Sequence, residues 1–205
     1  TTSLAIASNC TIVVTLNPTA LGLASDTIEI GYDNGLGAQT SNRAVQGTGV
    51  NPASLSIGDG ATYDYGTWAT GSTRDKTFTI TNTGDVPATT VAGGGLAAPF
   101  TFRGGSFPGT GGTCTATLNV SASCTIVVRY APTATGVQSD TIEISYVDGV
   151  GPQTATRAVQ GTGANPALLT ISDGVTYDYG TLAAGGSADK TFTISNTGGV
   201  AASSM

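Results

Sequence analysis

Hydrophobic and polar residues alternate in several short stretches of the chain, which is the pattern of β-strands that bury one face. The alternation is clearest at residues 76–81, 124–130 and 140–146. In each stretch, alternate positions carry mainly aliphatic or aromatic side chains. The positions between them carry mostly Thr, Ser, Glu or Arg. The pattern predicts a buried core that consists of Tyr65, Phe78, Ile80, Ile126, Val128, Tyr130, Ile142 and Ile144.

Other short apolar runs lie between turn-forming residues and predict further strands. The turn sequences VDGVG at 147–151 and DNGLG at 33–37 favour hairpins, because Asp-Gly and Asn-Gly pairs adopt positive φ easily. No stretch has a helical period. About seven short strands in one unit predict an all-β fold, an antiparallel β-sandwich of immunoglobulin-like type. The further strands are expected at 53–58, 86–92, 99–103, 115–120 and 152–160, with Tyr63 and Tyr65 on another.

The chain repeats itself with a period of 114 residues. Residues 1–91 align with 115–205 without a gap, and about three positions in five are identical. The sequence RAVQGTG at 43–49, for example, returns at 157–163. This period is too long for a solenoid repeat and has the length of one sandwich domain, so the chain is predicted to contain tandem domains.

The boundary between repeats is expected where VQGTG is followed by Asn-Pro, because Pro cannot continue a hydrogen-bonded ladder. Residues 51–164 then form one complete immunoglobulin-like repeat, the central unit. Residues 1–50, the leading segment, are the C-terminal part of a preceding repeat. Residues 165–205, the trailing segment, are the N-terminal part of a following one. Linkers of one or two residues predict stiff stacking of neighbouring repeats.

Several motifs carry a family resemblance that covers nearly the whole chain. They are YDYGTWATGSTRDKTFTITNTG, then SCTIVVRYAPTATG, DTIEISY and the closing VQGTG. The chain resembles the choice-of-anchor D repeats of bacterial surface proteins, relatives of the ASPM–SPD-2–hydin and major sperm protein-like domains. Tyr65 and Tyr130 stand where Phe is commoner. The resemblance implies an exported, multi-domain surface or extracellular protein.

Composition and charge narrow the possible functions. The net charge is −6 and the sequence has no Lys/Arg cluster, so nucleic-acid binding is not expected. No apolar run reaches the roughly 20 residues of a membrane helix, so no membrane insertion of this segment is expected. The absence of histidine removes Ser-His-Asp and Cys-His catalysis and nearly all zinc sites. We therefore expect no enzyme activity, no cofactor and no metal.

The three cysteines are Cys10, Cys114 and Cys124. Cys114 and Cys124 lie on adjoining predicted strands, and a disulfide is favoured over a reactive thiol because no histidine is available to form a thiolate. Such a bond indicates an oxidising compartment. Cys10 matches Cys124, but the match of Cys114 falls just before residue 1, so the partner of Cys10 is expected outside the chain start.

Three further residues allow either a functional or a purely structural interpretation. Asp64 and its copy Asp178 fit turn formation better than calcium binding, because no calcium-loop motif is present. Lys76 raises the possibility of an isopeptide bond, but a solvated lysine is the favoured interpretation. Trp68 is Leu182 in the other copy, and a role in packing between domains is favoured over sugar stacking.

Two functional hypotheses follow. The first is a structural protein, a stiff extracellular stalk, fibre or filament of β-sandwich units stacked head to tail. Its partners would be identical copies, because 1–50 and 165–205 each carry half of a core and need a neighbour to complete it. Either a longer covalent array or strand exchange between separate chains would supply that neighbour. The alternative is an adhesin or ligand-binding module that recognises a sugar or a host or partner protein through its loops, of which 93–113 is the longest Gly-rich candidate.

Overall fold

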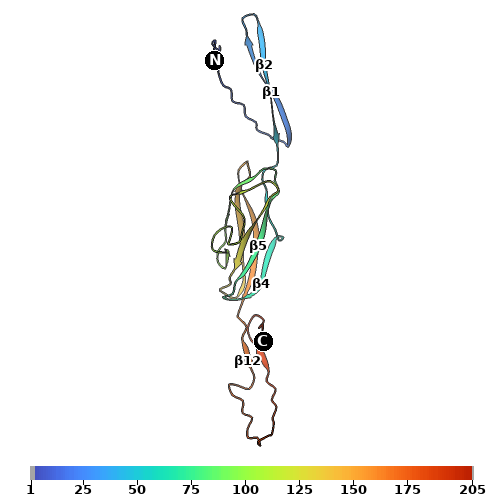
Figure 1. Cartoon of the computed structure of the whole chain (residues 1–205), viewed down its shortest axis with the longest axis vertical. Helices are drawn as coiled ribbons and strands as arrows, with labels where there is room; N and C mark the ends of the chain where they lie inside the picture. Colours follow the sequence, from blue (N-terminus) through green and yellow to red (C-terminus); the bar gives the residue numbers. More distant parts are fainter. Residues whose placement is uncertain (1–2, 205) are drawn as a thin grey trace. The chain divides into compact units, whose positions relative to one another are not determined.

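The computed structural model describes residues 3–204, and all regular elements in that range are β-strands (Figure 1). The chain divides into two compact units, one up to Asn51 and one from Pro52 onward, and each is described by itself. Residues 3–204 contain no helix that could cross a membrane. The all-β fold predicted from the alternation is therefore correct.

The first unit is built around one long hairpin of β1 (Gly22–Asp33) and β2 (Ala38–Gly49). The strands are antiparallel and in register from Gly22 opposite Gly49 to Asp33 opposite Ala38. The predicted turn is present: the Asp33 carboxylate accepts a hydrogen bond from the Gly35 amide, and Gly35 has a φ of 90°. Residues 10–19 have no strand partner in this structure.

The central unit consists of nine strands in two sheets. The first sheet has the order β4-β11-β10-β6-β8, in which β4 and β11 are parallel and the other pairs are antiparallel. The second sheet has the antiparallel order β3-β5-β9-β7. The strands are β3 (Leu55–Ile57), β4 (Thr62–Ala69), β5 (Arg74–Asn82), β6 (Ala88–Gly94), β7 (Phe100–Phe102), β8 (Thr117–Leu118), β9 (Ser123–Tyr130), β10 (Gly136–Val147) and β11 (Pro152–Ala164).

The core of this sandwich is the predicted one. All eight side chains that the alternation placed inside are buried, and seven of them, all but Tyr65, are fully buried. The Tyr65 hydroxyl donates a hydrogen bond to the main-chain oxygen of Val128, 3.0 Å away, which satisfies the one polar atom that this ring brings into the core. The immunoglobulin-like sandwich inferred from the strand pattern is therefore the fold of the central unit.

Two short motifs explain how the loops are fixed to the sheets. Asn82, in the sequence NTG, is fully buried, and its side chain accepts from the amides of Ser54 and Gly84 and donates to the main-chain oxygen of Val86. Gly163, in the closing VQGTG, faces inward so closely that a β-carbon there would collide with the main-chain oxygen of Ala134. Both motifs are thus requirements of close backbone packing.

One outer side chain of the sandwich is buried against expectation. The alternation placed Val127 on the solvent side of β9, but it is buried. The reason is the Gly-rich loop 103–113, which lies along β9: the Arg103 amide donates to the Val127 oxygen, and the Val127 amide donates to the Pro108 oxygen. The loop is thus a cover for the sheet that the alternation alone could not reveal.

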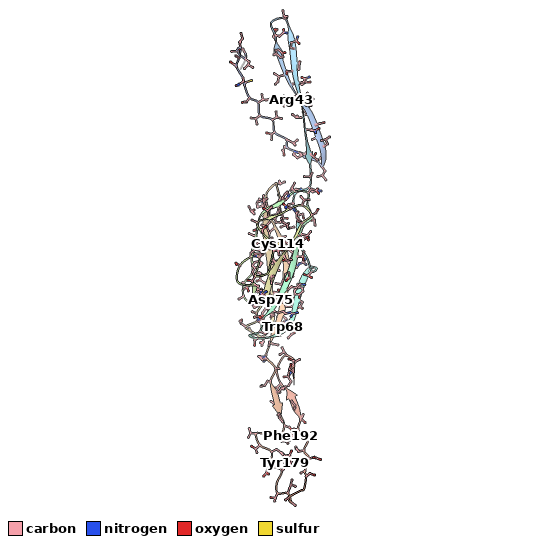
Figure 2. The ribbon with its side chains drawn as sticks, in the orientation of Figure 1. Arg43, Trp68, Asp75, Cys114, Tyr179 and Phe192 are labelled. Atoms are coloured by element: carbon pink, nitrogen blue, oxygen red, sulfur yellow. A yellow bond between two sulfur atoms is a disulfide. The ribbon has the colours of Figure 1, made fainter. Side chains whose placement is uncertain are left out.

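The trailing segment forms only the small pair β12 (Leu169–Ile171) and β13 (Ile194–Asn196). It repeats the register of β3 and β5, since Ile171 lies opposite Ile194 as Ile57 lies opposite Ile80. The rest of the expected strands is missing here: the sequence DKTFTI is in β5 at 75–80, but only its last residue is in a strand at 189–194. The side chains of this segment, including Tyr179 and Phe192, are shown in Figure 2.

Candidate self-association site

The structure joins Cys114 and Cys124 in a disulfide, with their Cα atoms 4.8 Å apart. Both residues are buried, and the bond ties the end of the Gly-rich loop to β9. Cys10 is free and exposed. The bonded pair is structural, and its equivalent is not formed at Cys10 within this chain.

The leading segment exposes the same apolar side chains that the central unit buries. Ile12 is 57% exposed, whereas its copy Ile126 is fully buried. Ile30 is 46% exposed, whereas its copy Ile144 is fully buried. The leading segment therefore exposes side chains that belong to both layers of a sandwich core in the central unit.

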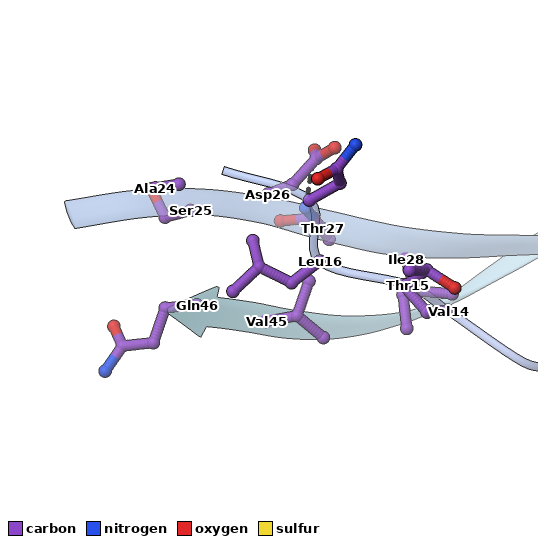
Figure 3. A pocket seen from close by; sticks show the side chains of 11 residues that line it. Val14, Thr15, Leu16, Ala24, Ser25, Asp26, Thr27, Ile28, Val45 and Gln46 are labelled. Carbon is purple, nitrogen blue, oxygen red and sulfur yellow. Dashed lines mark hydrogen bonds between the residues drawn. The ribbon is translucent and has the colours of Figure 1, made fainter. Parts of the chain in front are cut away.

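The first unit also has an open cavity of about 520 Å³ on its surface (Figure 3). Leu16 from the extended segment, Ile28 from β1 and Val45 from β2 contribute its apolar lining. Figure 3 shows the Leu16 and Val45 side chains beside one another over the hairpin. A concave surface of this size with an aliphatic floor can accept bulky apolar side chains.

The central unit shows what covers the same surface when a repeat is complete. The copies of Leu16, Ile28 and Val45 are Tyr130, Ile142 and Val159, and all three are fully buried. The Tyr65 ring from β4 packs on Tyr130, with the ring centres 5.5 Å apart. In a complete repeat, therefore, the Tyr65 ring of β4 covers the part of this floor formed by Tyr130.

The trailing segment carries copies of those aromatic side chains in nearly the same arrangement. Tyr177 and Tyr179 meet edge to face with ring centres 5.0 Å apart, as Tyr63 and Tyr65 do. The Tyr177 and Phe192 rings lie 5.5 Å apart, against 5.3 Å for the rings they copy. Tyr179 is 47% exposed and Phe192 is 38% exposed. The aromatic cluster of a repeat is thus already formed in the trailing segment, but the face that it buries in a complete repeat is exposed here.

Lysine residues support the aromatic cluster in both copies, which corrects the expectation of a solvated lysine at 76. Lys76 is half-buried, pairs with Asp59 at 3.1 Å and lies over the Tyr63 ring at 4.7 Å. Lys190 makes the same contacts with Asp173 at 3.1 Å and with Tyr177 at 4.8 Å. The signal was available in the alternation, because residue 76 has the same parity as Phe78 and so the same face of the strand.

Other polar candidates have structural roles in the central unit. The Asp64 carboxylate accepts hydrogen bonds from the Gln160 side chain and the Gly66 amide, which hold its pKa below the usual value. Asp178 accepts from the Gly180 amide in the same way. Trp68 is half-buried, and its indole N–H donates a hydrogen bond to the main-chain oxygen of Tyr65. Across residues 3–204 no group of three or more Cys, Asp or Glu residues could hold a metal ion.

An ion cluster on the outside of the second sheet distinguishes the central unit from its copies. Arg129 binds both carboxylate oxygens of Asp75, at 2.7 and 2.9 Å, and Arg103 lies 3.2 Å from the same carboxylate. The hydrogen bonds from Arg129 and the charges of the arginines hold the pKa of Asp75 below its usual range. At the position of Arg129 the leading segment has Thr15, which cannot form this ion pair.

Comparison with known proteins identifies the architecture. A family model described as the HYDIN/CFA65/VesB-like, Ig-like domain matches residues 58–162, just over half of the chain. No curated protein matches the chain. Among solved structures, the human CEP192 ASH/PapD-like domain 7 is similar at 13% identity and a TM-score of 0.42, over 56% of this chain and 87% of that one.

Two further similar structures come from a bacterial protease and from a member of the MSP family. The Vibrio cholerae VesB protease is similar at 20% identity and a TM-score of 0.43, over 55% of this chain and 32% of that one. WR4, a member of the MSP family from C. elegans, is similar at 10% identity and a TM-score of 0.34, over 56% of this chain and 99% of that one. The chain spans about a third of the length of the VesB protease.

Proposed function

Because the chain belongs to the HYDIN/CFA65/VesB-like family of Ig-like domains, whose fold prescribes no activity, we propose that it is a structural repeat protein. Its β-sandwich units associate head to tail, and the leading segment of one copy receives the trailing segment of the next. The product is a stiff extracellular stalk, fibre or filament. The contact is open-ended, since each copy offers two different, complementary surfaces.

One observation carries this proposal: the leading and trailing segments expose complementary parts of the core that the central unit buries. The floor of the cavity in the first unit contains Leu16, Ile28 and Val45, and the trailing segment presents Tyr179 and Phe192. Exposed apolar surfaces of this kind associate in water. The central unit provides the template for their fit, because it holds the equivalents of both parts in contact, as in the packing of Tyr65 on Tyr130.

Two further features support an extracellular structural role. The disulfide between Cys114 and Cys124 is compatible with an oxidising compartment. The Gly-rich loop 103–113 is bound to β9 through main-chain hydrogen bonds, which favours a covering role over an adaptable recognition loop. We propose no catalytic role, in line with the lack of histidine.

The test is the association state of the full chain. Sedimentation velocity over a range of concentrations should show species that grow with concentration, and electron microscopy should show linear particles. Ile28→Asp places a charge on the floor of the cavity and should weaken this association strongly. Val137→Asp is the matched control, because Val137 lies on β10 and is already exposed in the central unit; it should leave association unchanged.

A chain that remains monomeric at every concentration would refute the proposal. A monomer that binds carbohydrates on a glycan array would instead favour the alternative function, a surface module that recognises a sugar or a partner protein.

A further inference from the structure

Arg157 is an arginine on the core side of the sandwich. It lies on β11 two residues from both Ala155 and Val159, which are buried, so its side chain starts on the inner face. Its Nη2 atom donates a hydrogen bond to the main-chain oxygen of Ile57 on β3. Since β11 and β3 belong to different sheets, this contact bridges the two layers of the sandwich.

The bridge has an energetic cost that only this contact offsets. The Nε atom of Arg157 is buried and has no hydrogen-bond partner among the described residues. A buried guanidinium without an acceptor is strongly unfavourable, so the Ile57 oxygen is what makes the inward position tolerable. The sequence predicted a strand at 152–160 but did not single out the arginine at 157.

The leading segment repeats the donor side of this bridge. Arg43 lies opposite Ile28 on the hairpin as Arg157 lies opposite Ile142. The same hairpin register places Arg43 on the same face as Ile28, and Arg43 is exposed (Figure 2). The donor is thus present on a surface that has no second sheet within its own unit.

The trailing segment repeats the acceptor side. Ile171 lies opposite Ile194 on the β12–β13 pair, just as Ile57 lies opposite Ile80. Ile171 is 62% exposed, whereas Ile57 is buried. We infer that Arg43 of one copy donates to the main-chain oxygen of Ile171 of the next copy and so fixes the register of the junction. This inference rests on the proposed head-to-tail association.

An arginine in this position selects one register. A slip of one residue on either strand would turn every side chain to the opposite face and leave the guanidinium against apolar surface without its acceptor. The apolar contacts alone would tolerate such slips more easily, because they are not directional. Arg43 is therefore a positioning residue for assembly.

The test compares the association constants of full-length variants by sedimentation equilibrium. Arg43→Met keeps the aliphatic stem and removes the donor, and it should weaken association about tenfold or more, the usual effect of a lost hydrogen bond from a charged group. Arg43→Lys keeps the charge and should lose less. Arg157→Met should lower the stability of the central unit but leave association unchanged.

A second control separates loss of the bridge from damage to the hairpin. Asn42→Met places the same side chain on the neighbouring, outward position of β2, and it should not alter association. If Asn42→Met weakens association as much as Arg43→Met, or if Arg43→Met associates like the natural chain, the inference is overturned while the head-to-tail proposal stands. If the natural chain does not associate, the proposed function itself fails.

Discussion

The ring of Tyr130 lies 2.6 Å from the position that a β-carbon on Gly161 would occupy. Gly161 is the first glycine of the closing GTG, and the inner face of β11 has no room there for any side chain. The leading segment repeats this relationship, because the Leu16 side chain occupies the space beside Gly47. The close approach explains why glycine stands at this place in both copies.

Gly161→Ala should therefore destabilise the central unit by about 1–3 kcal/mol through overpacking. Trp68 is the only tryptophan and lies in the central unit, so its fluorescence during urea unfolding reports on this domain. Gly94→Ala is the control, because a β-carbon at Gly94 on β6 meets no atom within 4 Å. Equal stabilities of the two variants would contradict the close packing at Tyr130.

Ile142 and Ile28 allow a comparison of the same residue in two settings. Ile142 is fully buried, so Ile142→Ala should lower the free energy of unfolding by about 2–5 kcal/mol. Ile28→Ala should leave the unfolding of the central unit unchanged and weaken self-association, because Ile28 lines the open cavity. A negligible cost at Ile142 would mean that the core is assigned to the wrong face of β10.

The disulfide should contribute measurably to stability. The bond between Cys114 and Cys124 closes a short loop, and loop closure predicts a contribution of about 3 kcal/mol. Urea unfolding with and without a reducing agent measures this difference. Cys10→Ser should change neither curve under dilute conditions, since Cys10 is free.

The carboxylate of Asp75 should make stability depend on pH. Its pKa is lowered in the folded state by hydrogen bonds and charge from the arginines, so its stabilising effect is present above the unfolded pKa of about 4. That effect is lost as the pH falls through the lower folded value. The natural chain should thus exceed Asp75→Asn in stability at pH 7, and the two should converge below pH 4.

The size of this difference should be modest, because the carboxylate and both arginines remain about a third or more exposed. We expect about 1 kcal/mol or less at pH 7, reduced further by 1 M salt. A difference that persists unchanged from pH 7 to pH 3 would show that Asp75 acts through packing and not through its charge.

A cysteine cross-link can test the register of the proposed junction. In the central unit Ile80 lies opposite Cys124. The repeat therefore predicts that Ile194 of one copy lies opposite Cys10 of the next, within the Cα separation that a disulfide spans. Ile194→Cys should give covalent oligomers on a non-reducing gel after mild oxidation. Ser195→Cys, whose side chain is on the other face of β13, should give far fewer.

The central unit was largely predictable, because its strands alternate strictly and its partner strands lie within the same repeat. Residues 76–81 and 124–130 are in β5 and β9, as predicted. The segments show the limit of the method. The sequence CTIVV is a strand at 124–128 and is not a strand at 10–14, because a strand needs a partner for its ladder as well as a suitable pattern.

The polar contacts of the site were less accessible to sequence reasoning. The bridge from Arg157 to Ile57 joins residues 100 positions apart, and its acceptor is a main-chain atom that no side-chain pattern marks. The loop 103–113 has no periodicity, so its packing over Val127 could not be predicted. Lys76 was interpreted as a solvated lysine, although residue 76 has the same parity as Phe78 on β5 and so lies on the same face.

The parallel pairing of β4 with β11 has a consequence for how such a chain acquires its structure. β4 is among the first strands of the repeat and β11 is the last, so the first sheet cannot close until the end of the repeat has been synthesised or exported. Until then, the strands formed earlier remain without their final partner and expose their apolar faces to solvent. In a chain of similar repeats, β4 of one repeat can then pair with the last strand of a neighbouring repeat. Misfolding by such exchange between neighbouring repeats is the failure that this topology favours.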